Sequence, residues 1–231
     1  GIESNRIKDT IGGITRNPKR VMYASSPDRG LMLLLENWFR VIERVPDAEL
    51  HVFYGFHNYN VIIGHNGPDD WRVGHKARLL DLLKQPGVTW HDRVGQVKLW
   101  KEWAKSNIFF YPSDFCETSC ITSMEAQACG AIPVTTNFWA LRQNVLDGYK
   151  FDSTPQASEV VRSLMIEKVI ELLTDSAEWD EEQYSVSDPG GLSSHEVELS
   201  RRQQMQEDAS DTFDWRVVAD QWEEWIGEDT K

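Results

Sequence analysis

The chain has 231 residues, of which 40% are apolar and 26% are charged. This is the composition of a folded globular protein and excludes a disordered chain. The apolar runs are far shorter than the roughly 20 residues that a membrane-spanning helix needs, and no basic-then-apolar leader opens the chain. Three cysteines cannot form a fully paired disulfide framework. We therefore expect reduced thiols and a cytoplasmic protein without a membrane span.

The net charge of -13 is concentrated at one end of the chain. Residues 175–231 carry 17 acidic and 4 basic side chains, whereas the preceding 174 residues carry 20 of each. A neutral body offers no basic footprint for a nucleic-acid backbone, so no nucleic-acid partner is expected. The acidic end is interpreted as solvated surface, with docking of a basic partner as the alternative.

Short runs of β-branched or aromatic residues alternate with segments of helical period, the pattern of parallel βαβ units. Strands are predicted over residues 20–24, 50–54, 87–90, 108–111 and 132–135. Helices are predicted over residues 31–45, 76–83, 97–105, 118–129, 156–174, 196–208 and 213–226. Loops are predicted over residues 56–72, which are rich in Asn, Gly and Asp, and around residues 188–191. The predicted fold class is α/β, a Rossmann-like parallel sheet with helices on both faces and extra C-terminal helices.

Three tryptophans lie at helical spacing with other apolar residues and are predicted to be core: Trp38, Trp100 and Trp103. A loose group of polar residues in the predicted loop and just after it could bind a metal: His65, Asp69, Asp70 and His75. Their spacing matches no zinc or calcium pattern, so no metal site is predicted.

The segment over residues 111–134 joins a strand end, a polar loop, a helix start and two glutamates eight residues apart. In a parallel α/β sheet, ligands bind outside the carboxyl ends of the strands, where helix N-termini present unpaired N–H groups to anions. Thr118, Ser119 and Cys120 are therefore candidates to face a phosphate or a sugar. Glu125 lies beside the apolar face of the predicted helix, where a carboxylate is costly unless it is hydrogen-bonded. A ribose diol offers two suitable donors.

The two glutamates also have plainer interpretations. Glu117 is a favourable charge at a helix start, and Glu125 is a glutamate at the boundary of the core. A glycoside hydrolase would need its two carboxyl groups roughly 5–9 Å apart. Eight helical residues span about 12 Å, which argues against that pairing.

Glu117 and Glu125, followed by the run Ala-Gln-Ala-Cys-Gly-Ala-Ile-Pro-Val, resemble the paired-glutamate signature of retaining GT-B glycosyltransferases, in particular family 4. Other features fall in that family's order. Gly1-Ile2 resembles the end of the interdomain linker, and Arg29-Gly30-Leu31 resembles the phosphate-contacting Lys-Gly step. Residues 87–94 resemble the strand and loop that approach the base, and residues 215–219 resemble the closing helix. The likeness covers nearly the whole chain but only the second half of the usual two-domain enzyme. It divides the chain into an interdomain linker (1–18), a Rossmann-like donor-binding domain (19–178) and an acidic C-terminal helical extension (179–231).

The resemblance implies roles for the charged residues. Glu125 would bind the ribose hydroxyls of a nucleotide-sugar, and Glu117 would contact hydroxyls of the donor sugar. Arg29 would neutralise the diphosphate, for which the planar fork of donors in a guanidinium is suited. Glu117 and Arg29 are thus the candidate catalytic residues.

Further donor-binding positions follow from the same resemblance. The backbone N–H groups of residues 118–120 would hold the sugar or the diphosphate. The family has a second basic residue near the end of the first strand, where this chain has Ser25 and Ser26. These serines are candidates to bind the diphosphate, although they are also ordinary turn residues. The loop with Arg93 and Val94 would approach the base.

The implied function is the donor-binding half of a glycosyltransferase that uses a nucleotide-sugar and retains anomeric configuration. The nucleotide-sugar is a substrate, and no cofactor and no metal are expected. A sugar, lipid-linked or protein acceptor would bind through a missing N-terminal domain, so the isolated chain is expected to bind donor but to transfer sugar poorly. Two alternatives stay open: a non-catalytic donor-binding subunit that needs a separate acceptor-domain chain, and a GT-B-type sugar epimerase.

Overall fold

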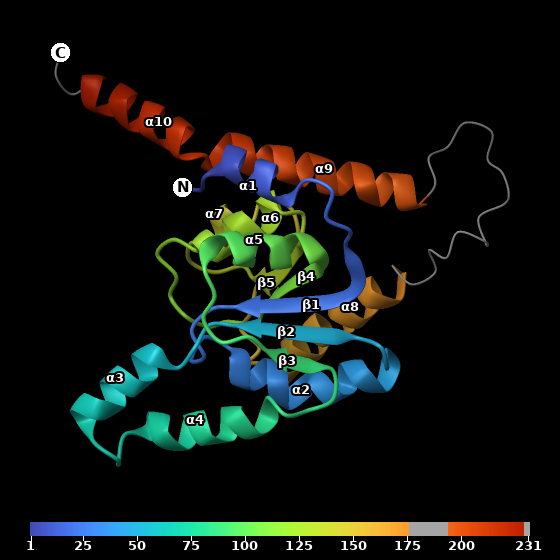
Figure 1. The fold of residues 1–231 in the computed structure, drawn as a ribbon, viewed down its shortest axis with the longest axis vertical. Coiled ribbons are helices and arrows are strands. Elements are labelled where there is room, and N and C mark those ends of the chain that lie inside the picture. The colour runs from blue at the N-terminus through green and yellow to red at the C-terminus, as the bar shows by residue number, and fades with distance from the viewer. Residues whose placement is uncertain (176–193, 229–231) are drawn as a thin grey trace, which may run out of the picture.

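The computed structural model describes residues 1–175 and 194–228. In this part of the chain, six strands form one parallel sheet in the order β3-β2-β1-β4-β5-β6 (Figure 1). The strands are β1 (Asn17–Ala24), β2 (Glu49–Phe53), β3 (Val88–Trp90), β4 (Ser106–Tyr111), β5 (Ile132–Thr136) and β6 (Tyr149–Phe151). The helices are α1 (Ser4–Ile11), α2 (Leu31–Arg44), α3 (His57–Asn66), α4 (Trp71–Leu82), α5 (Gln96–Lys105), α6 (Ile121–Ala128), α7 (Leu141–Asn144), α8 (Glu159–Asp175), α9 (Ser194–Phe213) and α10 (Trp215–Glu228).

Helices cover both faces of the sheet, which confirms the predicted α/β fold class. The helices α5 and α6 lie on one face, and α2 and α8 lie on the other (Figure 1). Every residue of β4 and β5 is buried because both faces of these central strands are covered. Trp38, Trp100 and Trp103 are fully buried, as predicted.

The strand order locates the natural ligand crevice of this sheet. The chain moves outward from β1 through β2 to β3 and then returns to place β4 on the other side of β1. Connections on the two sides of this reversal run over opposite faces, so the carboxyl ends of β1 and β4 open into a crevice. The segments that follow these two strands hold Arg29 and the two glutamates.

The prediction of a loop over residues 56–72 is wrong. The structure forms α3 there, and α4 begins at Trp71 and not at residue 76. Tyr59 is 2% exposed and packs edge-on against Phe56, and Asp70 caps α4 by accepting the N–H of Arg72 at 2.8 Å. Tertiary packing and one N-cap outweigh the loop-like composition of the segment.

Other differences from the predicted elements are small. The helix predicted from residue 118 begins at Ile121, and the short elements α7 and β6 were not predicted. The helices predicted over 156–174, 196–208 and 213–226 are present as α8, α9 and α10 with shifted ends. The loop predicted around residues 188–191 lies outside the described residues.

The N-terminal and C-terminal segments form a further layer over α5 and α6. Within residues 1–18, α1 contacts α5, α6 and α9, and both Ile2 and Ile7 are buried. The division of the chain into linker, donor-binding domain and extension stays a prediction. Beyond α9, the helix α10 points away from the body (Figure 1) and exposes Trp222 and Trp225.

No helix in the described part of the chain is long and apolar enough to cross a membrane. The three cysteines are free thiols, as expected: Cys120 and Cys129 are buried, and Cys116 is exposed.

Candidate functional site

A cavity of about 680 Å³ opens at the carboxyl edge of the sheet. Its walls come from the segments that follow β1, β2 and β3 and from helices α5 and α6. Six of the residues predicted to bind the donor line this cavity: Ser25, Ser26, Arg29, Arg93, Val94 and Glu125. The other four, residues 117–120, are not among the residues that line it.

Glu125 is held in the cavity wall by two donors from α5. Gln96 Nε2 donates to Glu125 Oε1 at 2.5 Å, and the indole nitrogen of Trp100 donates to the same oxygen at 3.0 Å. The Glu125 side chain is 6% exposed, and this burial raises the pKa of its carboxyl, against the opposing effect of the two hydrogen bonds. Its Oε2 accepts no hydrogen bond from the residues that the structure describes. A free acceptor oxygen therefore remains beside the cavity.

Glu117 lies behind the cavity, joined to it by Arg29. Arg29 Nη1 donates to Glu117 Oε1 at 2.9 Å, and the Tyr111 hydroxyl donates to the same oxygen at 2.5 Å. Partial burial disfavours the charge of Arg29, but the adjacent carboxylate outweighs it and raises the pKa of the guanidinium. Burial, together with the bond to Glu117, raises the pKa of Tyr111. The three side chains form a charge-balanced cluster at the switch between β1 and β4.

Close backbone contact brings Arg29 to Glu117. Gly30 starts α2 with φ of 95°, and a Cβ atom there would lie 2.3 Å from the carbonyl oxygen of Pro112. Only glycine accepts both the dihedral angle and the contact, so the β1–α2 turn packs directly against the loop after β4. Phe115 in that loop places its ring 3.9 Å from the Arg29 guanidinium carbon, a cation–π contact.

The three backbone N–H groups predicted to hold the sugar or the diphosphate differ in the loop before α6. The Cys120 N–H donates to Asn144 Oδ1 at 2.9 Å, so that group is already paired within the protein. Thr118 and Ser119 are exposed, and their N–H groups have no hydrogen-bond partner among the described residues. These two donors remain open to a ligand next to Glu117.

The far wall of the cavity carries a second cation. Arg93 is exposed, and its side chain forms no hydrogen bond or ion pair with any residue in the described ranges. The two serines after β1 are already engaged: Ser25 Oγ lies 3.3 Å from the Tyr111 hydroxyl, and Ser26 Oγ donates to Asp28 at 2.5 Å.

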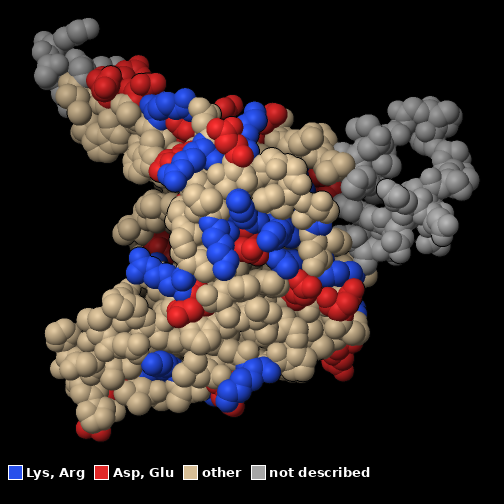
Figure 2. Space-filling model, viewed as in Figure 1, with Lys and Arg blue, Asp and Glu red and all other residues tan. Residues whose placement is uncertain are grey.

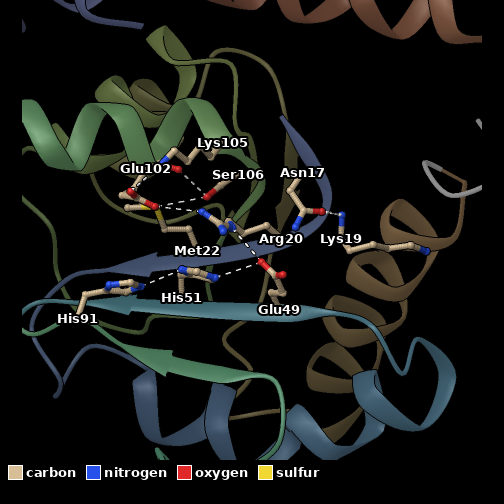
Figure 3. A network of polar contacts seen from close by, with 10 residues as sticks. All are labelled: Asn17, Lys19, Arg20, Met22, Glu49, His51, His91, Glu102, Lys105 and Ser106. Atoms are coloured by element: carbon tan, nitrogen blue, oxygen red, sulfur yellow. Dashed lines mark hydrogen bonds and ion pairs between the residues drawn. The ribbon is translucent and has the colours of Figure 1, made fainter. Parts of the chain in front are cut away.

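A polar network supports the segment before Arg93 (Figure 3). His51 Nδ1 and His91 Nε2 lie 2.8 Å apart, and His51 Nε2 lies 3.2 Å from Glu49. Arg20 connects this pair to α5, with bonds of 3.1 Å to Glu49 and 3.0 Å to Glu102. Burial lowers the pKa of His51 to about 4, and Arg20 and His91 add to the shift. Figure 2 shows Lys and Arg around an acidic group in this region, over α5 and β1.

His91 connects this network to the cavity. Its ring stacks on Phe53, with centroids 4.3 Å apart, and Phe53 lines the cavity. The network therefore holds the start of the loop that carries Arg93.

A second cavity, of about 640 Å³, lies at the opposite edge of the sheet. It is lined by α1, α9 and the segment before β1, and it contains none of the predicted site residues. The carboxyl edge is where a parallel sheet binds ligands, so the first cavity is the candidate site.

Two of the four residues considered as a metal site, Asp70 and His75, have structural partners. Asp70 caps α4, and His75 Nδ1 lies 3.1 Å from the Tyr59 hydroxyl. The part of the chain that the structure describes holds no group of three or more His, Cys, Asp or Glu able to bind a metal ion.

Comparison with known proteins gives one family. The model of the family "Glycosyl transferases group 1" matches residues 27–183, which include both glutamates and Arg29. The chain belongs to this family.

Solved structures of other proteins share the fold of this group 1 glycosyl transferase chain. Sucrose-phosphate synthase from Thermosynechococcus elongatus is 16% identical with a TM-score of 0.66, over 99% of this chain and 51% of that one. HepE from Anabaena, solved with UDP, is 15% identical with a TM-score of 0.63, over 99% and 56%. Staphylococcus aureus TarM, solved with UDP, fondaparinux and α-GlcNAc-glycerol, is 11% identical with a TM-score of 0.61, over 90% and 35%. A search of curated proteins finds no match.

The family model and the shared fold together confirm the predicted resemblance to the C-terminal, Rossmann-like domain of GT-B glycosyltransferases, whereas retention and the likeness to family 4 stay predictions. This group 1 chain spans between 35% and 56% of the length of the three structures. At these identities the likeness concerns the fold alone.

Sequence reasoning missed the residues that hold the two glutamates in this group 1 site. Gln96 and Trp100 hold Glu125, and Tyr111 holds Glu117. One signal was present: Gln96 and Trp100 are four residues apart, which places them on the same face of a helix. What that face contacts is a tertiary relationship.

Proposed function

We propose that this chain is the donor-binding half of a retaining, metal-independent glycosyltransferase that uses a nucleotide-sugar. The observation that carries the proposal is Glu125, a buried carboxylate in the cavity wall. One of its oxygens is held by α5, and the other has no donor among the residues that the structure describes. Burying a carboxylate is costly unless both oxygens find donors. The two vicinal hydroxyls of a ribose would supply the missing donors.

The diphosphate would lie beside Arg29. One of the five N–H groups of this guanidinium is used by Glu117, and its buried Nε has no hydrogen-bond partner in the described residues. The planar fork of donors in this guanidinium suits a diphosphate. Arg93 lines the same cavity from the loop after β3, which is expected to approach the base.

Glu117 would act next to the donor sugar. Its carboxylate is fixed by Arg29 and Tyr111, and the open N–H groups of Thr118 and Ser119 lie in the same loop. A fixed acceptor beside fixed donors suits a ring with several hydroxyls. We place the donor sugar at this loop.

When the sugar leaves the diphosphate, negative charge develops on the departing oxygen. Arg29 is already oriented by Glu117 and by the ring of Phe115, so it would stabilise that charge without reorganisation. This arrangement supports transfer without a metal ion. Retention of configuration rests on the paired-glutamate resemblance. The sugar, lipid-linked or protein acceptor would be held by a domain outside this chain.

Calorimetric titration of the chain with UDP, GDP and ADP, with and without EDTA, tests the proposal. We expect one nucleoside diphosphate to bind in either condition and Glu125→Gln to weaken it roughly 10- to 100-fold, the range for a hydrogen bond to a charged group. Glu43→Gln, at an exposed position on α2, is the matched control. Absence of binding by all three nucleotides, or equal binding by Glu125→Gln, would contradict the proposal.

A further inference from the structure

Tyr54 has an unusual backbone conformation at the edge of the candidate site. It follows β2 directly and has φ of 101°, a region that residues with a Cβ atom rarely enter. Such a conformation is unfavourable and persists only where the surroundings impose it, most often at functional sites. The residue therefore calls for an explanation beyond packing.

Three hydrogen bonds hold Tyr54 in place, two on its main chain and one on its side chain. The Tyr54 N–H donates to the carbonyl of Asp92 at 3.1 Å, and its own carbonyl accepts from the indole nitrogen of Trp90 at 3.1 Å. The Tyr54 hydroxyl accepts from Asn58 Nδ2 at 3.2 Å. Main chain and ring are thus both fixed, and the main chain is tied to the segment that leads into Arg93.

The fixed residue lines the donor cavity, away from the diphosphate residues. Tyr54 follows β2, whereas Arg29 follows β1 and the loop with Glu117 follows β4, on the other side of β1. The neighbouring wall is apolar: Phe53, Val94 and Leu99 line the cavity beside it. Tyr54 itself is 38% exposed, so a large aromatic surface remains uncovered next to this wall.

We propose that Tyr54 is the stacking surface for the nucleobase of the donor. This inference rests on the proposed function and adds to it the residue that binds the base. A nucleobase is a flat ring with an apolar face, and stacking on an aromatic side chain suits any base because every base has such a face. With the ribose at Glu125 and the diphosphate at Arg29, the apolar wall with Tyr54 is the part of the cavity left for the base.

The backbone strain at Tyr54 predicts that its replacement by glycine stabilises the protein. Glycine adopts positive φ without penalty, so Tyr54→Gly should remove the strain while it removes the ring. We expect its melting temperature to rise by a few degrees and its affinity for nucleotide to fall roughly tenfold. A residue kept only for packing would show the opposite change in stability.

Two substitutions distinguish the contribution of the aromatic ring to binding from the contributions of side-chain bulk and of the hydroxyl. We expect Tyr54→Phe to bind the preferred nucleoside diphosphate within about twofold of the wild type and Tyr54→Leu to bind it roughly tenfold more weakly. NMR titration of the nucleotide should show an upfield ring-current shift of the base protons with the wild type and Tyr54→Phe but not with Tyr54→Leu. Phe39→Ala, an exposed aromatic on α2 outside the cavity, is the control and should bind normally.

The binding results test the role of Tyr54 and the proposed function separately. If the wild type binds a nucleoside diphosphate and Tyr54→Leu binds it equally well, with the same shift of the base protons, the role of Tyr54 is wrong and the proposed function stands. If the wild type binds no nucleoside diphosphate, both are wrong.

Discussion

The indole nitrogen of Trp100 and the carboxylate of Glu125 lie 3.0 Å apart, between two helices that pack together on one face of the sheet. Trp100 is 2% exposed and Glu125 is 6% exposed. An ionised carboxylate in such surroundings needs fixed donors, and the indole is one of the two that α5 supplies. Trp100 is therefore both a core residue and a hydrogen-bond donor to the candidate site.

Replacing Trp100 by phenylalanine should change the pH dependence of nucleotide binding. Burial already raises the pKa of Glu125, and loss of the indole donor removes an effect that opposes the shift. A protonated carboxyl is a poorer acceptor for ribose hydroxyls, so affinity should fall as pH decreases through this pKa, and in Trp100→Phe the fall should begin at higher pH. Nucleotide titrations of both proteins over a series of decreasing pH values measure this difference.

Trp103→Phe is the matched control, because Trp103 is a fully buried tryptophan of the same helix and its indole nitrogen has no hydrogen-bond partner in the described residues. Its pH profile should equal that of the wild type. Coincident profiles for the two variants would show that the indole of Trp100 does not tune Glu125.

The pair of Arg29 and Glu117 should show strong coupling in a double-mutant cycle. Arg29→Met leaves a Glu117 carboxylate that is 7% exposed and whose one remaining hydrogen-bond donor among the described residues is the Tyr111 hydroxyl. In the Glu117→Gln background that buried charge is absent, so the same Arg29→Met change should cost less. Because Arg29 is partly exposed, we expect a coupling energy of about 2 kcal/mol, below that of a fully buried pair. Urea unfolding of the four proteins measures it.

The exposed pair Arg6–Glu3, at 2.8 Å, provides the comparison and should couple by about 0.5 kcal/mol or less. Additive effects of Arg29→Met and Glu117→Gln would rule out a stabilising ion pair at the site.

The buried histidine of β2 should make the protein less stable in acid. The pKa of His51 is lowered to about 4, so between pH 4 and its ordinary value of about 6.5 the unfolded chain binds the proton more readily than the folded one. Stability is therefore full above about pH 6.5 and is lost as pH falls toward 4. After a discount for partial exposure, we expect a loss of about 2 kcal/mol.

Urea unfolding from pH 7.5 to pH 4.5 measures this loss, and His51→Gln should flatten part of the slope. His65→Gln, at an exposed histidine near the end of α3, should leave it unchanged. An equal slope in wild type and His51→Gln would assign the acid sensitivity to other groups.

The sequence was sufficient for the features that depend on local pattern and on rules for parallel sheets. Runs such as Ile-Phe-Phe-Tyr before Pro112 identify buried strands. The carboxyl ends of these strands meet at one edge, which brings Arg29 and Glu125 to one cavity. The helix α3 was missed because its Asn and Gly content is typical of a loop, while its stability comes from the packing of Tyr59 and Phe56.

The interactions that complete the site could not be read from the sequence. Arg29 and Glu117 are 88 positions apart, and their ion pair depends on the contact of Gly30 with Pro112. The pairing of the Cys120 N–H with Asn144 likewise depends on how α7 packs beside the loop. These relationships are set by tertiary geometry, which single-residue patterns do not contain.

Arg202 on α9 should be one of the most sensitive positions for stability. Its guanidinium is buried and donates to the carbonyl of Gly130 at 2.7 Å and to the carbonyl of Asn107 at 3.2 Å, and it pairs with Glu198 at 2.9 Å. Arg202→Met would remove these buried hydrogen bonds and the ion pair, at a cost of about 3 kcal/mol.

The adjacent Arg201 provides a control for this substitution, because its ion pair with Asp147, at 2.8 Å, is partly exposed and Arg201→Met should cost about 1 kcal/mol. Urea unfolding compares the two, and nucleotide affinity should stay unchanged in both because neither residue lines the candidate cavity. Equal costs for Arg201→Met and Arg202→Met would mean that α9 is not anchored through its buried arginine. A larger cost at Arg202 would establish that this C-terminal helix is part of the folded body that supports the site.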